Sequence, residues 1–321
     1  MLRLLLSTVL CLTALAKDAV YELSGHIEPE TRASVSIYGA TTPFSDATLS
    51  DDHGRFRFSR LAAGSYTLAV FVPERGEARK TVEVGPRSAD SRGRVAVSLN
   101  FKDSDFTFDD VTRQRNAVST RELSVPERAW REYEQAKKDL ARRDAAAAGS
   151  HLEKAVTVAP QFEQAWNTLG TIAYQAQKYE RAEQCFRQAL AQKPEAYEPL
   201  VNLGGVLINL HKLDEAREYN QRAVSIRSND ALANSQLGMT YFELGRLELA
   251  EKYLLRAVEI DPAHFSHPQL LLADVHVKLN RPHRAAEDLE SFLEHHPDWP
   301  RAAEIRTAVS RLRKQQSKED R

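Results

Sequence analysis

The chain has 321 residues, enough for two domains of the usual size of about 100 to 200 residues each. Its 44 Lys and Arg residues nearly balance its 45 Asp and Glu residues, and residues 17–125 and 126–321 are each close to neutral. Proteins that bind nucleic acid neutralise phosphates with a basic domain or stripe, so we expect no nucleic-acid partner. A hydrophobic fraction of 42% and a charged fraction of 28% exclude collagen-like, disordered and polytopic membrane proteins.

The first 16 residues have the features of a secretory signal peptide. Arg3 gives a positive start, Leu4–Leu15 is a largely apolar run of 12 residues, and residues 14–16 form a small-x-small cleavage site. Twelve residues are too few for a membrane-spanning helix, which needs about 20. We expect cleavage after Ala16, an exported protein of the periplasm or the extracellular space, and no integral membrane segment after cleavage.

Cleavage would leave a single cysteine, Cys185, so the mature chain would have no intrachain disulfide. We interpret Cys185 as a small buried residue of a helix.

From Val20 to Phe101, apolar residues alternate with polar ones in short runs that turn residues separate. A period of two is typical of half-buried antiparallel strands. About seven such strands without a helix between them predict an all-β Greek-key sandwich over residues 17–101. In residues 102–125 the alternation ends and charged and polar residues increase, which indicates a linker.

Two motifs in this region combine a turn with the strand that follows it. They read D-x-x-G-x-F and L-x-x-G-x-Y-x-L, and their residues are Asp51, Gly54 and Phe56, then Leu61, Gly64, Tyr66 and Leu68. Together they resemble the carboxypeptidase-regulatory-like family, whose members have a transthyretin-like Greek-key sandwich. The resemblance implies an accessory domain that performs no chemistry of its own.

Small residues recur every 34 residues in the second part of the chain. Three columns agree: Ala136, Gly170, Gly204 and Gly238; Ala148, Ala182, Ala216 and Ala250; Ala155, Ala189, Ala223 and Ala257. A fourth column holds Pro160, Pro194 and Pro262, with Ser228 as its one departure. The pattern predicts pairs of helices that touch at the small residues, with proline ending the second helix of each pair.

This period resembles the tetratricopeptide repeat, or TPR. The clearest unit has the family's signature residues at Trp166, Leu169, Gly170, Tyr174, Ala182, Phe186, Ala189 and Pro194. We assign an all-α solenoid of about five helix pairs and a capping helix to residues 126–316, with units at 129–162, 163–196, 197–230, 231–264 and 266–299 and the cap at 300–316. The two modules together resemble bacterial cell-envelope proteins.

No motif for a nucleophile elbow, a phosphate loop, a dinucleotide site or a metallopeptidase is present in the sequence. We therefore expect no enzymatic activity, no catalytic residues, no cofactor and no metal. His264, His267, His276, His283 and the pair at 295–296 could be drawn as metal ligands. We interpret them as loop and surface histidines, because no cysteine or paired carboxylate at ligand spacing completes a set.

The TPR resemblance implies that the first helix of each unit lines a concave groove. The residues expected on its surface are Tyr133, Lys137, Asn167, Thr171, Tyr174, Val201, Asn202, Ile208, Ser235, Met239 and Phe242. They combine apolar anchors with amides that can pair with a peptide backbone. Tyr174, Ile208 and Phe242 could instead pack between units. Some TPR proteins bind C-terminal carboxylates with a clamp of Lys, Asn and Arg residues. This sequence has Thr171, Leu232 and Gln236 at three of the clamp positions, so we do not expect a C-terminal carboxylate as the ligand.

The sequence thus favours a non-enzymatic exported adaptor or scaffold that binds a peptide or protein in the groove. The alternative is a carbohydrate- or cell-wall-binding accessory protein that binds its ligand with the sandwich. Exposed aromatic residues on the sandwich would support this alternative. The sequence indicates neither the identity of the partner nor an oligomeric state.

Overall fold

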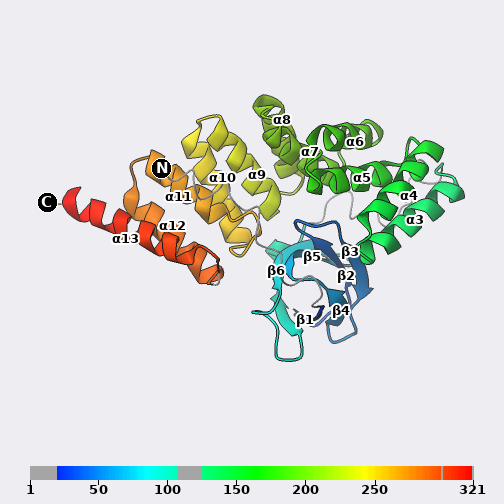
Figure 1. Ribbon diagram of the computed structural model, residues 1–321, viewed down its shortest axis with the longest axis horizontal. Helices are drawn as coiled ribbons and strands as arrows, with labels where there is room; N and C mark the ends of the chain where they lie inside the picture. The colour runs from blue at the N-terminus through cyan, green and yellow to red at the C-terminus, as the bar shows by residue number, and fades with distance from the viewer. Residues whose placement is uncertain (1–19, 108–123, 298, 320–321) are drawn as a thin grey trace.

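The computed structural model describes residues 20–107, 124–297 and 299–319, and it places a strand-rich part below an arched row of helices (Figure 1). The expected signal peptide and residues 108–123 of the expected linker lie outside the described residues. Among the described helices, none is long and apolar enough to cross a membrane.

Seven strands in the described residues form two sheets that pack on one core. The three-stranded sheet has the order β4-β1-β7 and the four-stranded sheet the order β3-β2-β5-β6. Residues of both sheets, such as Leu23 and Leu68, share one hydrophobic cluster. The strands are β1 (Tyr21–Glu28), β2 (Ser34–Gly39), β3 (Ser45–Leu49), β4 (Arg55–Leu61), β5 (Gly64–Val72), β6 (Gly76–Val84) and β7 (Arg94–Asn100).

One ladder differs from the antiparallel pairing that the alternation predicts. β1 pairs with β4 antiparallel, but it pairs with β7 in parallel, with Leu23 opposite Val95. Alternation determines which side chains enter the core, and Val35 and Ile37 are indeed fully buried. It carries no information about the direction of the neighbouring strand.

The two sequence motifs form the turns expected of them. Asp51 Oδ1 accepts hydrogen bonds from the backbone N–H groups of His53 (3.0 Å) and Arg55 (2.8 Å). Gly54 has a φ of 72°, and a Cβ there would lie 2.7 Å from the carbonyl oxygen of Ile27. In the second motif the Tyr66 hydroxyl donates to the carbonyl of Ala62 at 3.0 Å. The carboxypeptidase-regulatory-like resemblance stays a prediction.

Eleven α-helices in the described residues form the solenoid and its end. They are α3 (Glu127–Ala141), α4 (Ala145–Val158), α5 (Glu163–Gln175), α6 (Tyr179–Gln192), α7 (Tyr197–Asn209), α8 (Leu213–Ile226), α9 (Ala231–Glu243), α10 (Leu247–Ile260), α11 (Pro268–Lys278), α12 (Pro282–His295) and α13 (Ala302–Glu319). Helices α3 to α12 form five consecutive pairs, and α13 contacts α12. The unit boundaries given above remain predictions.

The small residues of the repeat lie where helices touch. Ala182, Ala216 and Ala250 are fully buried, and a Cβ on Gly170 would lie 2.6 Å from the ring of Phe186. Cys185 is a fully buried residue of α6, as predicted, and burial raises the pKa of its thiol to about 11. These positions are therefore packing sites.

The turn inside each helix pair has one residue in the left-handed region: Arg143, Gln177, His211 and Gly245 are 34 residues apart, and Asn280 of the last pair follows 35 residues later. Only glycine adopts this conformation without strain. We expect His211→Gly to raise the free energy of unfolding by about 0.5–1 kcal/mol and Gly245→Ala to lower it by about 1 kcal/mol. Urea denaturation of both variants measures this, and effects of the same sign would contradict it.

Several histidines near the C-terminal end are buried, so their interpretation as loop and surface residues was wrong. His264, His276 and His296 expose 5%, 2% and 9% of their surface. His276 lies 2.5 Å from Asp288 and 3.1 Å from Glu251, and His267 packs on Phe292. Within the described ranges, no three His, Cys, Asp or Glu side chains are arranged to hold a metal ion.

The pKa of His267 falls from 6.5 to about 3 because the ring is buried and lies near His296 and His264. Below pH 6.5 the unfolded chain therefore binds a proton that the folded chain does not, and this group removes stability as the pH falls from about 6.5 toward 3. Asparagine tolerates the left-handed backbone at position 267. In the His267→Asn variant, we expect the free energy of unfolding to fall less steeply on acidification, by up to about 1 kcal/mol per pH unit. Denaturation of both proteins at several pH values measures the difference, and parallel curves would contradict it.

Candidate functional site

The concave face of the solenoid is turned toward the four-stranded sheet (Figure 1). A cavity of about 1160 Å³ lies between them, with walls from both parts of the chain. Seven of the predicted groove residues line it: Tyr133, Lys137, Asn167, Thr171, Tyr174, Val201 and Asn202. They come from α3, α5 and α7, so the N-terminal half of the predicted groove surrounds the cavity.

The other four predicted residues lie elsewhere. Ser235 is buried and its hydroxyl accepts a hydrogen bond from Ser266 at 2.8 Å. Met239 and Phe242 pack on the core of the last repeats, and Ile208 packs on the core of the middle repeats. The packing alternative therefore describes Ile208 and Phe242. Tyr174 packs on the same core as Ile208 and also lines the cavity.

Two amides at the centre of the helical wall bind each other. Asn202 Nδ2 donates to Asn167 Oδ1 at 3.2 Å. This leaves Asn167 Nδ2 as a donor and Asn202 Oδ1 as an acceptor that have no hydrogen-bond partner among the described residues. Next to them, Tyr133 packs on Phe162 with ring centroids 5.0 Å apart, and burial raises the pKa of Tyr133 to about 12.

The second wall is the outer face of the four-stranded sheet. Ser36 and Tyr38 of β2 alternate with the core residues Val35 and Ile37, so they point away from the sandwich core and line the cavity. Tyr38 keeps 42% of its surface exposed there. Burial and the nearby carboxylate of Glu77 raise the pKa of the Tyr38 hydroxyl.

A cluster of charged side chains joins the sheet to the middle of the solenoid. Glu77 Oε1 lies 2.8 Å from Arg79 Nη2 and 3.0 Å from Arg227 Nη1. Arg79 also lies 3.0 Å from Glu198 and 3.8 Å from Asp230. Arg227, Asp230 and Glu77 expose only 4%, 6% and 9% of their surface. We call these five residues the docking cluster.

The charges of the docking cluster compensate one another. Burial by itself would lower the pKa of Arg79, but Glu77, Asp230 and Glu198 together raise it well above its usual value. The same balance raises the pKa of Arg227, whose guanidinium also stacks 4.3 Å from the ring centroid of the fully buried Tyr197. Both arginines stay charged, so the cluster is a set of paired charges removed from water.

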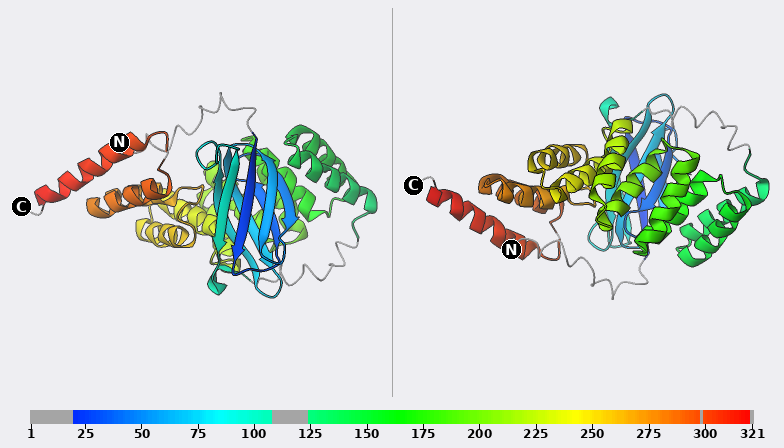
Figure 2. Two further views of the ribbon diagram at one scale, coloured as in Figure 1. Left: turned by 90° about the horizontal axis from the view of Figure 1, so that it is seen from below. Right: turned by 90° about the horizontal axis from the view of Figure 1, so that it is seen from above.

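Further hydrogen bonds fix the sheet on both sides of this cluster. The backbone N–H of Thr81 donates to Asp261 Oδ2 at 2.9 Å, and Lys80 Nζ donates to the carbonyl of Ile260 at 2.6 Å. Toward the N-terminal end of the solenoid, Gln175 Nε2 donates to the carbonyl of Gly39 at 3.2 Å. The sandwich lies across the middle of the helical row in both views of Figure 2.

The sequence analysis did not predict this docking, although the repeat pattern contained a signal of it. Ser228, the departure in the proline column, lies between Arg227 and Asn229, and Asn229 donates to the carbonyl of Ser104 at 3.0 Å. The predicted fifth unit begins at residue 266, one residue later than a strict 34-residue period would place it, and close to His264, which lines the cavity. Both breaks in the period therefore lie where the sandwich meets the solenoid.

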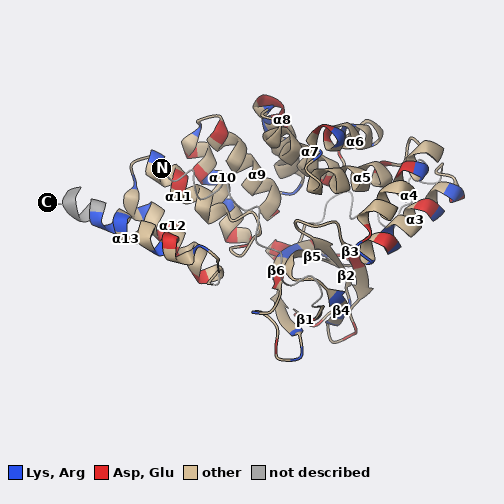
Figure 3. Ribbon diagram, viewed as in Figure 1, with Lys and Arg blue, Asp and Glu red and all other residues tan. Residues whose placement is uncertain are grey.

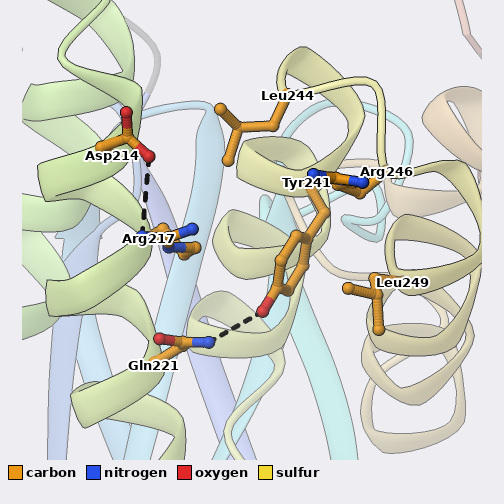
Figure 4. Close-up of a pocket in the computed structure, with 7 residues that line it drawn as sticks. All are labelled: Asp214, Arg217, Gln221, Tyr241, Leu244, Arg246 and Leu249. Carbon is orange, nitrogen blue, oxygen red and sulfur yellow. Dashed lines mark hydrogen bonds and ion pairs between the residues drawn. The ribbon is translucent and has the colours of Figure 1, made fainter.

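A smaller pocket of about 380 Å³ lies between α8 and the following pair α9–α10 (Figure 4). Its polar lining residues bind one another: Gln221 Nε2 donates to the Tyr241 hydroxyl at 2.8 Å, and Arg217 pairs with Asp214 at 3.6 Å. Acidic and basic residues are intermixed along the described helices (Figure 3), so charge does not single out another face. The larger cavity is the candidate site.

Paired helices stacked around a concave face define a helical-repeat solenoid of the TPR class. Residues 130–290, half of the chain, match the family model described as the cilia and flagella-associated protein 70 middle TPR-like domain, and residues 270–313 match the tetratricopeptide repeat. The chain belongs to this TPR-like family.

Solved structures share the fold. MamA 41-end from Desulfovibrio magneticus RS-1 is 20% identical with a TM-score of 0.50, and the match covers 55% of this chain and 99% of that one. PilW, described as a widely conserved type IV pilus biogenesis factor, is 21% identical with a TM-score of 0.50, covering 59% and 92%. None of the curated proteins matches the chain.

Proposed function

We propose that this protein is a non-enzymatic, exported interaction scaffold that binds a peptide or protein in the concave groove of its solenoid. The observation that carries the proposal is the cavity of about 1160 Å³, because residues from three successive first helices line it together. Tyr133 and Tyr174 offer apolar anchors with little rotamer freedom, and Asn167 and Asn202 offer one unused donor and one unused acceptor. This set of groups suits the backbone of a bound segment.

The test uses peptides selected from a phage-displayed library of random 12-residue sequences by panning on the immobilised full chain. We expect Asn202→Ala to weaken their binding about tenfold, because truncating one partner of a desolvated hydrogen bond costs about 1–2 kcal/mol. Asn100→Ala is the matched control, since Asn100 is an exposed amide residue of β7 that does not line the cavity. Equal affinity for the Asn202 variant and the control would contradict the proposal.

Export is a separate part of the proposal and rests on residues 1–16. Expression of the full chain in a bacterium with an export system should give a mature protein that begins at Lys17. Mass spectrometry of the N-terminal peptide measures this, and a mature chain that retains Met1 to Ala16 would contradict it.

The alternative, carbohydrate binding by the sandwich, would use an exposed aromatic side chain. In the described part of the sandwich, Tyr38 is the aromatic residue that keeps a large exposed surface, and it faces the helices across the cavity. A sugar bound there would occupy the same cavity, so this alternative has no separate site to support it.

A further inference from the structure

The sandwich supplies one wall of the candidate site, and this restricts what the site can bind. On β2, β3 and β5, small side chains surround Tyr38 on the outer face of the sheet. Tyr38 lies opposite Thr67 on β5 and Ser45 on β3, and Ser36 lies opposite Ala69 and Ala47. Because its cross-strand neighbours are small, Tyr38 projects from the sheet into the cavity.

This wall has a fixed position. The docking cluster and the contact between Thr81 and Asp261 attach β6 to α7–α10, and the bond from Gln175 to Gly39 attaches the end of β2 to α5. At the same end, the Arg143 guanidinium donates to the carbonyl of Arg60 and lies 5.9 Å from the ring of Phe44. The helical wall and the sheet wall are thus held from both sides of the cavity.

The two walls carry uncharged hydrogen-bonding groups beside charged residues such as Lys137 and most of those in the docking cluster. The sheet presents the hydroxyls of Ser36, Tyr38 and Thr67, and the helices present Tyr133 and the amides of Asn167 and Asn202. The volume of about 1160 Å³ exceeds the range of about 300–1000 Å³ typical of small-molecule pockets. A folded domain cannot pass between two walls of one chain, whereas an extended chain can.

From this geometry we infer that the sandwich and the solenoid form one composite site, which clamps an extended peptide segment between Tyr38 on the sheet and the pair Asn167 and Asn202 on the helices. The inference rests on the proposed function and deepens it, because it replaces "a peptide or protein" by an extended segment held between two walls. The unused amide atoms of Asn167 and Asn202 match the C=O and N–H groups of its backbone. Tyr38 packs against its side chains from the opposite wall.

The experiment compares the two walls with the same peptides that panning of the random 12-residue library selects. Three variants of the full chain are titrated: Asn202→Ala in the helical wall, Tyr38→Ala in the sheet wall and Leu49→Ala as the control. Leu49 is 62% exposed on β3 and does not line the cavity, so it matches Tyr38 in being an exposed apolar residue of the same sheet. Circular dichroism of each variant verifies that the fold is retained.

We expect Asn202→Ala and Tyr38→Ala each to weaken binding at least about fivefold and Leu49→Ala to change it less than about twofold. Loss with Asn202→Ala alone overturns the composite site and leaves the groove function standing. Loss with Tyr38→Ala alone overturns the composite site and the groove together and moves binding to the sandwich. If panning enriches no peptide, or if neither variant matters, both the inference and the proposed function fail.

Discussion

Replacing Arg227 with alanine should destabilise the docked arrangement of sandwich and solenoid by up to about 3–5 kcal/mol, because Arg79 would then be left as the one cation facing the three carboxylates of the docking cluster. Arg227 is 4% exposed and holds Glu77, which is 9% exposed, at 3.0 Å. We expect a larger radius of gyration in small-angle X-ray scattering, and separate unfolding transitions for the two parts in urea.

Arg222→Ala is the control for this variant. Arg222 lies near the end of α8, five residues before Arg227, and pairs with Glu195 at 3.0 Å. It is 41% exposed, so its loss should cost less than about 1 kcal/mol. The double variant Glu77→Ala with Arg227→Ala should cost less than the sum of the two single variants, since neither charge then remains buried alone. An unchanged radius in Arg227→Ala would show that the docking cluster does not hold the two parts together.

Adding a single methyl group at Gly204 should lower the free energy of unfolding by about 1–3 kcal/mol. A Cβ at this position would lie 1.9 Å from Oδ1 of Asn220, which is fully buried and donates to the hydroxyl of Thr240 at 3.1 Å. Asn220 would have to move and lose that bond. The measurement is urea denaturation of Gly204→Ala.

The same substitution at Gly149 should have the opposite sign. Gly149 lies inside α4, and a Cβ there would meet no atom within 4 Å. Gly149→Ala should therefore raise stability by up to about 1 kcal/mol through helix propensity alone. Equal effects at both glycines would mean that the small columns of the repeat are not packing sites.

Much of the local structure could be predicted from the sequence, because it depends on residues close together in the chain. The columns of Ala and Gly predicted the helix contacts, and alternation predicted that Val35, Ile37 and Leu68 enter the core. Asn167 and Asn202, which are 35 residues apart, could be placed on the concave face because the first helices of successive repeats lie side by side.

The docking could not be predicted in the same way, because Glu77 and Arg227 are 150 residues apart and belong to different periodic patterns. The repeat pattern shows that Ser228 departs from the proline column, but it does not indicate that the sandwich binds beside it. For the same reason the sequence suggested that Ser235, Met239 and Phe242 share one groove with Asn167. Leu232 and Gln236 of the same helix line the cavity, whereas these three residues lie on the side of α9 that packs on the last repeats. Only three-dimensional packing decides which side of the helix faces the sandwich.

The two attachments of β6 lie at equivalent places in neighbouring repeats. Arg227 follows α8 and Asp261 follows α10, exactly one 34-residue period later, and they contact Glu77 and Thr81 of the same strand. Four residues of a strand extend about 13 Å. The strand therefore spans the step from one helix pair to the next. Solenoids commonly change length by gaining or losing whole units, but a unit inserted between α8 and α10 would separate these two contacts beyond the reach of β6. The length of one strand thus fixes the number of repeats in the middle of this protein, and the contacts of Gln175 and Arg143 with the sandwich fix the repeats at its N-terminal end as well.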